Sequence, residues 1–384
     1  MRSRSWKGDM THSEGNGHTA NETSAAGSGQ GPVLVTGAFG LVGSAVVREL
    51  EAGGYAATAT DLDTSANRSA AGQCRSGNIA VRWADLTQAD QVDDLVRAVR
   101  PRAIVHLAAM IPPMCYQRPE LARRVNVEAT ATLLRSASAM DSPPRFVQAS
   151  SVAVYGPRNP FRTAELLTPD TPVRPRDLYG LHKAEAEELV RASELEWLIL
   201  RLGGVLTTAP KLSIDADTLY FEAALPADGR IQTIDVRDVA RAFVAAVNRP
   251  VAREIFLIGG DESHRLLQRD VAARIAAAVG LVNGIPASLP GNPDSDDDWF
   301  ATDWMDTARS QRALEFQRYS FPAMLDEIRR NAGAVRYLLR PAAPLVRRHL
   351  WRSSPYRKSP GDFANPWTAV YARLGDPAPD RPVA

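Results

Sequence analysis

The chain of 384 residues carries 45 Lys and Arg residues against 44 Asp and Glu residues, so its formal net charge is +1. This balance gives no overall attraction to nucleic acid or to an anionic membrane, and a hydrophobic content of 45% is ordinary for a soluble globular protein. The length predicts one large domain or two interlocked ones.

The cysteines and the hydropathy pattern predict a cytoplasmic protein. The two cysteines, Cys74 and Cys115, lie in different neighbourhoods with no CxxC spacing. Free thiols in a reducing compartment fit this usage better than a disulfide or a metal site. The sequence contains no secretory signal and no apolar stretch of the roughly 18 residues that a membrane span requires. We therefore expect no bound metal and no stable membrane insertion.

The first half of the chain alternates between two patterns. Residues 1–31 are polar and glycine-rich without periodicity, which predicts a disordered leader. From residue 32, short β-branched runs (32–36, 55–60, 79–83, 103–109, 145–150 and 197–201) alternate with helical stretches (41–52, 88–99, 119–139 and 178–193). Apolar strands separated by helices predict an α/β fold, a doubly wound parallel sheet of the Rossmann type covered on both faces.

The second half departs from this alternation. The alternation of strands and helices is weak in 205–230. A strand and a helix are predicted in 231–247, and one more strand at 254–260. The region after it is helix-rich and contains a loop rich in Pro and Asp. The predicted domains are a Rossmann domain (32–204 and 231–260) and a smaller, helix-rich C-terminal substrate lobe (205–230 and 261–335) packed on the carboxyl ends of the strands.

The tail, 336–384, is basic, with Leu and Trp between its cations. These cations are Arg336, Arg340, Arg347, Arg348, Arg352, Arg357 and Lys358. The pattern permits a membrane-surface helix, but Pro341, Pro344 and Pro355 interrupt any long helix. We therefore favour a basic C-terminal appendage that is solvated or packs in an oligomer.

Three glycines separate the first strand from the first helix in the stretch TGAFGLVG. Gly37 allows a tight turn, Gly40 lets a pyrophosphate approach the backbone, and Gly43 lets the helix pack close to the sheet. The helix N-terminus offers free N–H groups and a partial positive charge to phosphates. Phe39 and Leu41 belong to the same predicted cofactor-binding turn.

A carboxylate ends the next predicted strand. Asp61 follows Gly43 by 18 positions, which suits an acidic residue that binds a ribose 2′-OH. The same carboxylate would repel a 2′-phosphate, and Leu62 after it offers no cation. The pattern therefore predicts NAD(H) in preference to NADP(H).

Seven motifs occur in order over about residues 32–330. They are TGAFGLVG, ADLTQ, HLAA, VNVEATATLL, QASSVAVYG, LYGLHK and IDVRDVARA. Together they resemble the extended short-chain dehydrogenase/reductase family, which includes NAD-dependent nucleotide-sugar epimerases and dehydratases. The resemblance implies a catalytic set of Ser151, Tyr179 and Lys183, with Ser151 holding the substrate oxygen and Lys183 also bonding the nicotinamide ribose.

The residue chemistry agrees with this resemblance. Tyr179 and Lys183 are four residues apart, so they share one face of a helix. An ammonium one turn away favours the phenolate, so we expect it to lower the pKa of Tyr179 from about 10. Tyr179 can then exchange a proton with a substrate hydroxyl or carbonyl while a hydride moves to or from the nicotinamide.

Other family positions carry over from the resemblance as well. Asp85 and Leu86 match the pair that lines the adenine pocket, and Ala108 and Ala109 match the segment that passes beneath the cofactor. Asn126 matches an Asn that is mainly structural in relatives, and a kinking or capping role and a catalytic role both remain open.

Further polar residues near these motifs are expected to be structural. His106 lies on an apolar strand and is predicted to be a packed core histidine, and His182 is given no role. Asp235, Arg237 and Asp238 match a junction between a strand and a helix, where we expect them to cap the helix and to pack the domains.

The sequence also departs from the family pattern. Dehydratases of the family carry an Asp-Glu pair after the active-site Thr, whereas Ser151 is followed by Val152 and Ala153, so dehydration is disfavoured. The stretch LRLGGVLTTAP replaces the usual sequence after the sixth strand, which puts a nucleotide-sugar substrate in doubt. Residues 110–119 are expected to form a loop over the active site, with Met114, Cys115 and Tyr116 as soft apolar surface.

Three functions remain open at this point. The first is a sugar or nucleotide-sugar epimerase with tightly held NAD and no net redox change. The second is an NAD-dependent dehydrogenase or reductase of an apolar alcohol or ketone, such as a sterol or an aryl ketone. The third is a non-catalytic dinucleotide sensor, which is disfavoured because such proteins commonly lose the Tyr/Lys pair. We expect a small-molecule substrate, no nucleic acid, and a homodimer formed through helices 88–99 and 119–139.

Overall fold

The computed structural model describes residues 31–74, 77–209, 215–357 and 361–381, so the predicted leader lies outside the described residues apart from Gly31. A seven-stranded parallel sheet has the order β3-β2-β1-β4-β5-β6-β9. Its strands are β1 Val33–Thr36, β2 Ala57–Asp61, β3 Ile79–Trp83, β4 Ala103–His106, β5 Arg145–Ser151, β6 Trp197–Leu202 and β9 Glu254–Ile258. Strand order reverses between β1 and β4, where Val35 pairs with Ala59 of β2 and Val105 of β4. Such a reversal opens a crevice at the carboxyl ends of the strands.

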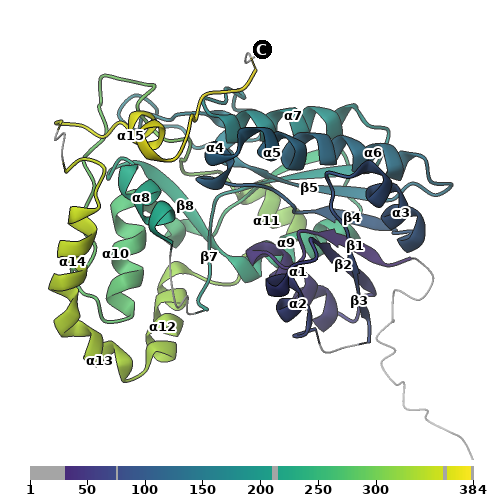
Figure 1. Ribbon diagram of the computed structural model, residues 1–384, viewed down its shortest axis with the longest axis horizontal. Helices are drawn as coiled ribbons and strands as arrows, with labels where there is room; N and C mark the ends of the chain where they lie inside the picture. Colours follow the sequence, from purple (N-terminus) through teal and green to yellow (C-terminus); the bar gives the residue numbers. More distant parts are fainter. Residues whose placement is uncertain (1–30, 75–76, 210–214, 358–360, 382–384) are drawn as a thin grey trace, which may run out of the picture. The chain divides into compact units, whose positions relative to one another are not determined.

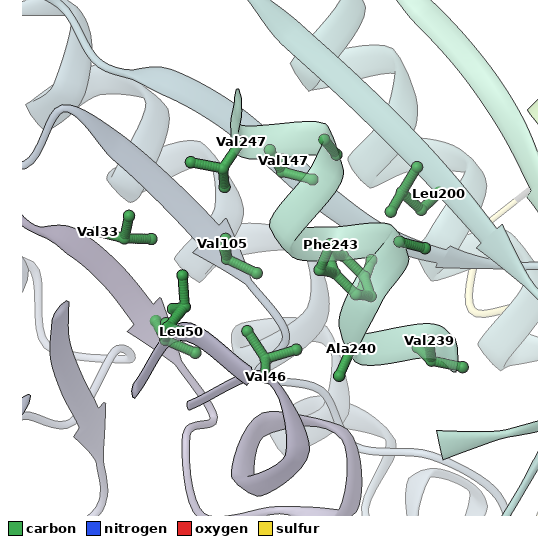
Figure 2. Packing of buried hydrophobic residues seen from close by; sticks show 14 of the residues in the cluster. Val33, Val46, Leu50, Val105, Val147, Leu200, Val239, Ala240, Phe243 and Val247 are labelled. Atoms are coloured by element: carbon green, nitrogen blue, oxygen red, sulfur yellow. The ribbon is translucent and has the colours of Figure 1, made fainter. Parts of the chain in front are cut away.

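Helices cover both faces of this sheet (Figure 1). One face carries α1 Leu41–Ala52 and α9 Val236–Asn248, and the other carries α3 Ala89–Val99, α6 Ala129–Ser138 and α7 Leu178–Ala192. Alternate strand residues point to opposite faces: Val33 and Val35 join one apolar cluster, whereas Leu34 joins the other. Val46 and Leu50 of α1 gather with Phe243 of α9 in the first cluster (Figure 2). The predicted doubly wound α/β fold is confirmed.

A second, three-stranded sheet has the order β10-β8-β7. Its strands are β7 Gly204–Leu206, β8 Arg230–Asp235 and β10 Arg265–Leu267, with helices α8 Ala216–Ala224, α10 Gln268–Ala278 and α12 Phe321–Ala332 nearby. The sequence grouped the strand at 231–235 with the large sheet, but β8 pairs with β7 and β10. The physical reason is that β7 follows the end of β6 directly and offers β8 a partner outside the large sheet.

The C-terminal region continues the small lobe with three helices. They are α13 Val335–Leu339, α14 Ala343–Arg352 and α15 Pro366–Arg373, and a 3₁₀ turn joins the first two. Pro341 and Pro344 occupy first-turn positions, where no N–H is needed, and the chain there forms two short helices and a 3₁₀ turn, so the prolines interrupt a long helix as expected. Val370 and Leu374 are buried, so this part of the tail is not solvated as an appendage would be. No described helix is both long and apolar enough to cross a bilayer.

Candidate active site

The glycine turn after β1 leaves room for a ligand against the main chain. Gly37 has φ +62°, and a Cβ there would lie 2.7 Å from the backbone N of Ala108. A Cβ on Gly43 would lie 2.1 Å from the carbonyl oxygen of Gly37, so α1 can approach the turn only because that residue is glycine. At Gly40 the nearest atom to a Cβ is 3.4 Å away. Gly40 is also the N-cap of α1, and because glycine has no side chain it makes no capping hydrogen bond to the helix.

Asp61 and Asp85 stand at the ends of neighbouring strands. The carboxylate of Asp61 accepts hydrogen bonds from the backbone N–H of Phe39 (3.1 Å) and of Leu62 (2.9 Å), which ties the end of β2 to the glycine turn. The carboxylate of Asp85 accepts from the N–H of Thr87 at 2.9 Å and holds the turn after β3. The predicted cofactor residues therefore line adjacent strand ends. Leu86 is buried in the sheet core, and Leu41 is 44% exposed at the start of α1.

The segment after β4 is held by Asn126. Its side-chain amide accepts a hydrogen bond from Met110 N (2.7 Å) and donates one to Met110 O (2.9 Å). Asn126 lies in a π-helical turn, Arg124–Glu128, that interrupts the helix predicted at 119–139. These bonds give it a structural role, and they fix the chain that follows Ala108 and Ala109. His106 is 1% exposed and contacts Thr36 and Thr130, so it is a core histidine as expected.

Ser151, Tyr179 and Lys183 come together at the carboxyl end of the sheet. Ser151 is the last residue of β5, and Tyr179 and Lys183 lie in the first turns of α7. A hydrogen bond between Ser151 and Tyr179 lowers the pKa of the phenol, although burial is the larger effect. The ammonium of Lys183 lies 5.8 Å from the centre of the Tyr179 ring and donates to Ala149 O at 2.9 Å.

The expectation that Lys183 lowers the pKa of Tyr179 is wrong in this structure. Burial raises the pKa of Tyr179, the ionisable neighbours Cys115 and Asp177 raise it further, and the Ser151 hydrogen bond opposes them. Burial lowers the pKa of Lys183 to about 8. The physical reason is that Lys183 directs its ammonium to a backbone carbonyl, while the apolar surroundings of Tyr179 disfavour a phenolate.

Sequence reasoning missed a buried pair that holds the start of α7. Asp177 is the N-cap and accepts from the N–H groups of Tyr179 (3.2 Å) and Gly180 (3.3 Å). Tyr116 donates its hydroxyl to the same carboxylate at 2.6 Å. Tyr116 and Cys115 are therefore core residues and not the exposed loop surface that was expected, whereas Met114 is 55% exposed. The Asp at an N-cap position was a visible signal; its partner, 61 residues away, was not.

Two further contacts fix α7 against the sheet. A Cβ on Gly180 would lie 2.6 Å from Ala153 O, so glycine is needed where the helix meets the turn after β5. Glu187 forms a buried ion pair with Arg201 of β6 at 2.6 Å and accepts from Ser150 of β5 at 2.5 Å. These contacts place the helix that carries Tyr179 relative to the strand that carries Ser151.

The C-terminal strap, which we define as residues 374–380, crosses the start of α7. Leu178 donates its N–H to Pro377 O at 2.8 Å. Asp380 pairs with Arg123 at 2.6 Å and with His182 at 3.2 Å. His182, given no role from the sequence, is thus a buried anchor of the strap.

The junction at the start of α9 has the structural role that the sequence indicated. Asp235 is the N-cap and accepts from Arg237 N at 2.8 Å. The guanidinium of Arg237 pairs with Asp235 and with Glu327 of α12. Asp238 accepts from the backbone of residues 318 and 319. Among the described residues, no group of three His, Cys, Asp or Glu side chains is placed to hold a metal ion.

A model of the NAD dependent epimerase/dehydratase family matches residues 33–207, the segment that contains the glycine turn, Asp61 and the Ser151, Tyr179 and Lys183 set. This segment of the chain is similar to the NAD-dependent epimerase/dehydratase family. The resemblance found in the sequence motifs is thereby confirmed.

Curated relatives match this chain over part of their length. Methionine adenosyltransferase 2 subunit beta of Rattus norvegicus is 29% identical over 191 residues, 50% of this chain and 52% of that protein. UDP-glucose 4-epimerase 2 of Oryza sativa is 31% identical over 181 residues, 44% of this chain and 43% of that protein. The chain spans about half the length of the curated relatives it matches.

Solved structures share the fold of this chain over most of its length. UDP-glucose 4-epimerase from Thermus thermophilus, in complex with NAD, aligns with a TM-score of 0.63 and 23% identity over 79% of this chain and 99% of that one. UDP-glucuronic acid 4-epimerase from Bacillus cereus aligns with a TM-score of 0.61 and 18% identity over 80% of this chain and 99% of that one. At these identities the comparison supports the fold.

Proposed function

We propose that the chain is an NAD-dependent oxidoreductase or epimerase that exchanges a hydride at a secondary alcohol or ketone of a sugar or nucleotide sugar. The observation that carries this proposal is the convergence of Ser151, Tyr179 and Lys183 at the carboxyl end of the sheet that also carries the glycine turn. The similarity to the family supports the same chemistry.

The described residues fit a dinucleotide. The space above Gly40 and the N-terminus of α1 suits a pyrophosphate. Asp61 is held at the end of β2, where its carboxylate suits ribose hydroxyls and disfavours a 2′-phosphate. Asp85 and Leu86 would border the adenine, and Ala108 and Ala109 would lie beneath the cofactor. Bound NAD supplies the hydride acceptor or donor.

The chain's own residues would manage the proton. Ser151 would hold the substrate oxygen, and Tyr179 would donate or accept the proton on that oxygen. Lys183 would position the nicotinamide ribose and add positive charge near the phenol. Val152 and Ala153 after Ser151 are buried and carry no acid or base, so elimination of water remains disfavoured.

A second candidate is a dehydrogenase or reductase of an apolar alcohol or ketone. The observation that favours it is the apolar cluster around Tyr179, which includes Met110, Tyr220, Phe221 and Phe300. The names of the Oryza epimerases favour the sugar substrate. A non-catalytic role is the third candidate, since other relatives are named as a subunit of methionine adenosyltransferase, but Ser151, Tyr179 and Lys183 are all retained here.

One experiment distinguishes these candidates. The purified chain is analysed for co-purified NAD and then assayed with UDP-sugars and with hydrophobic ketones. An epimerase retains NAD and interconverts a sugar without net absorbance change at the nicotinamide band. A dehydrogenase gives a steady absorbance change with free NAD(H). A chain that binds NAD and turns over neither substrate class contradicts the catalytic proposal.

We also propose a cytoplasmic homodimer that pairs through α3 and α6. The free thiols of Cys74 and Cys115 support a reducing compartment. Sedimentation of the full chain tests the dimer, and a monomer at micromolar concentration contradicts it.

A further inference from the structure

The helical run α13–α14 packs on the small lobe through one face. Leu339, Ala343, Val346 and Leu350 recur at intervals of three or four residues, and all four are partly or fully buried. Two contacts hold the run: Arg347 donates to Asn283 O at 3.3 Å, and Gly280 lies directly against the backbone of residue 336. The other side of the run is therefore held outward. Figure 1 shows α13 and α14 at the edge of the lobe, beyond α10 and α12.

This outward side, which we call the α13–α14 outer face, carries large apolar side chains. Leu338 is 76% exposed and Leu345 is 71% exposed, the two highest values for large hydrophobic residues in the described chain. On α14, Leu345 shares one side with Arg348 and Arg352, three and seven residues later, and Leu338 lies on the adjoining helix α13, across the 3₁₀ turn Arg340–Ala342. Trp351 is 56% exposed, but it lines the pocket between α14 and α8 together with Leu350 and is not part of this face. Exposed apolar surface of this kind marks an interaction site.

The same region is strongly basic. Residues 328–361 contain eight arginines and one lysine and no acidic residue, although the whole chain is nearly neutral. Arg340, Arg348 and Arg352 are exposed, and no ion pair joins any of them to another described residue. These cations are therefore available to an external anionic surface.

We propose that the α13–α14 outer face docks the protein peripherally on an anionic phospholipid membrane. Arg348 and Arg352 lie beside exposed Leu345 on one side of α14, and exposed Leu338 follows on α13; this composition matches helices that lie in the membrane interface. The arginines would meet lipid phosphates while Leu338 and Leu345 enter the acyl boundary. A nucleic acid would satisfy the arginines but would leave the leucines in water, so the apolar residues favour a membrane. This inference does not depend on the proposed enzyme activity.

The test is co-sedimentation of the full chain with lipid vesicles. We expect binding to phosphatidylcholine vesicles that contain phosphatidylglycerol, little binding to pure phosphatidylcholine, and weakening as salt is raised. Equal binding to both vesicles, or binding to neither, overturns the proposal.

Matched variants assign the binding to this face. The double variant Arg348→Gln/Arg352→Gln should weaken vesicle binding about 25-fold, since each interfacial arginine contributes roughly a factor of five. The control Arg191→Gln/Arg312→Gln removes two other exposed arginines, on α7 and α11 Ala308–Leu314, and should change binding less than about twofold. Equal losses in the two variants would mean that only net charge matters, which contradicts a localised face.

The leucines separate a membrane from other partners. Leu338→Ser/Leu345→Ser should weaken vesicle binding at least tenfold, in the order of magnitude expected for two buried leucines, with unchanged thermal unfolding because both side chains are exposed. If this variant binds vesicles normally but the arginine variant loses affinity for duplex DNA, the face binds nucleic acid and the proposal is wrong. If it instead converts a dimer to a monomer, the face is an interface between copies and the proposal is also wrong.

Discussion

Tyr179 lies between two opposing influences. Burial raises the pKa of its phenol and the hydrogen bond with Ser151 lowers it, while Lys183 is turned toward Ala149. A neutral phenol is ready to donate a proton to a carbonyl, and it would need the positive charge of an oxidised nicotinamide ring or of a redirected Lys183 to act as a base. The proposed proton transfer therefore depends on changes in charge when the site fills.

Replacement of Tyr179 tests its role directly. Tyr179→Phe should reduce turnover by a factor of about 10² to 10⁴, because the proton donor is lost, and should leave NAD affinity close to that of the parent. Initial rates and NAD titration give the two values. The companion variant Ser151→Ala should have a raised KM and a smaller loss of turnover than Tyr179→Phe. Full activity of Tyr179→Phe would contradict the proposed proton transfer by Tyr179.

Lys183 predicts a pH dependence of stability. Its pKa is about 8 in the folded chain against 10.5 for the ordinary group. Between these values the unfolded state binds more protons, so the free energy of unfolding rises with pH in this window, whereas below pH 8 both states are protonated and this group adds no pH dependence. Relative to Lys183→Met, the parent should gain roughly 2–3 kcal/mol between pH 8 and pH 10.5. Denaturant unfolding of both proteins across this pH range measures this gain. A difference in the free energy of unfolding that stays constant with pH would contradict the shifted pKa.

Gly37 offers a test with a matched control. Gly37→Ala places a Cβ 2.7 Å from Ala108 N at a φ of +62°, whereas Gly54→Ala adds a Cβ at φ +72° with nothing within 4 Å. Both variants carry the backbone strain of about 1–2 kcal/mol. Gly37→Ala should be destabilised further and should lose NAD binding, as measured by unfolding and by NAD titration. Equal behaviour of the two variants would mean that the close approach to Ala108 is unimportant.

At the scale of elements, α7 is fixed by contacts from every side. Gly180 allows it to meet the turn after β5, the Glu187–Arg201 pair ties it to β6, and the C-terminal strap covers its first turn. The strap adds a long-range tie that the family motifs do not contain. The geometry at Tyr179 therefore depends on the last residues of the described chain.

Loss of the strap anchor should loosen the start of α7. Asp380→Asn weakens the pairs with Arg123 and His182 and should lower the free energy of unfolding by about 1–2 kcal/mol, as expected for a partly buried charged pair. The amide of Leu178, which bonds to Pro377, should exchange hydrogen faster.

The control is Asp376→Asn, whose side chain bonds only within its own turn. Because Arg123 lowers the pKa of Asp380 to about 2, the stability that Asp380 adds is present above pH 4 and is lost as the pH falls toward 2. If the difference in the free energy of unfolding between the parent and Asp380→Asn persists at pH 2, the ion pair is contradicted.

At the scale of the molecule, the cofactor should stabilise the whole chain. NAD at about a hundredfold excess over its dissociation constant should raise the free energy of unfolding by about 2.7 kcal/mol, and NADP should have a smaller effect. Asp61→Ser should reduce this preference, whereas Asp63→Ser, which removes an exposed carboxylate paired with Arg68, should leave it intact. Thermal unfolding with each nucleotide gives the comparison. Equal stabilisation of the parent by NAD and NADP would contradict the role of Asp61.

Local patterns predicted the large sheet and its helices well. The helix expected at 41–52 matches α1, and that at 178–193 ends one residue beyond α7. Hydrophobic periodicity and glycine spacing are local properties, so the sequence alone could define them. The structure of region 205–230 was harder to predict from the sequence. Its strand β7 has only three residues and is stabilised by pairing with β8, not by a hydrophobic pattern of its own.

By itself, the sequence determined the parallel sheet, the glycine turn with Asp61, and the placement of Ser151, Tyr179 and Lys183 on one strand end and one helix. Only the tertiary structure decided which groups surround them. Tyr116 meets Asp177 across 61 positions and His182 meets Asp380 across 198. Burial by such distant segments sets the pKa of Tyr179, and no local pattern records it, because desolvation depends on every chain segment that packs around a group.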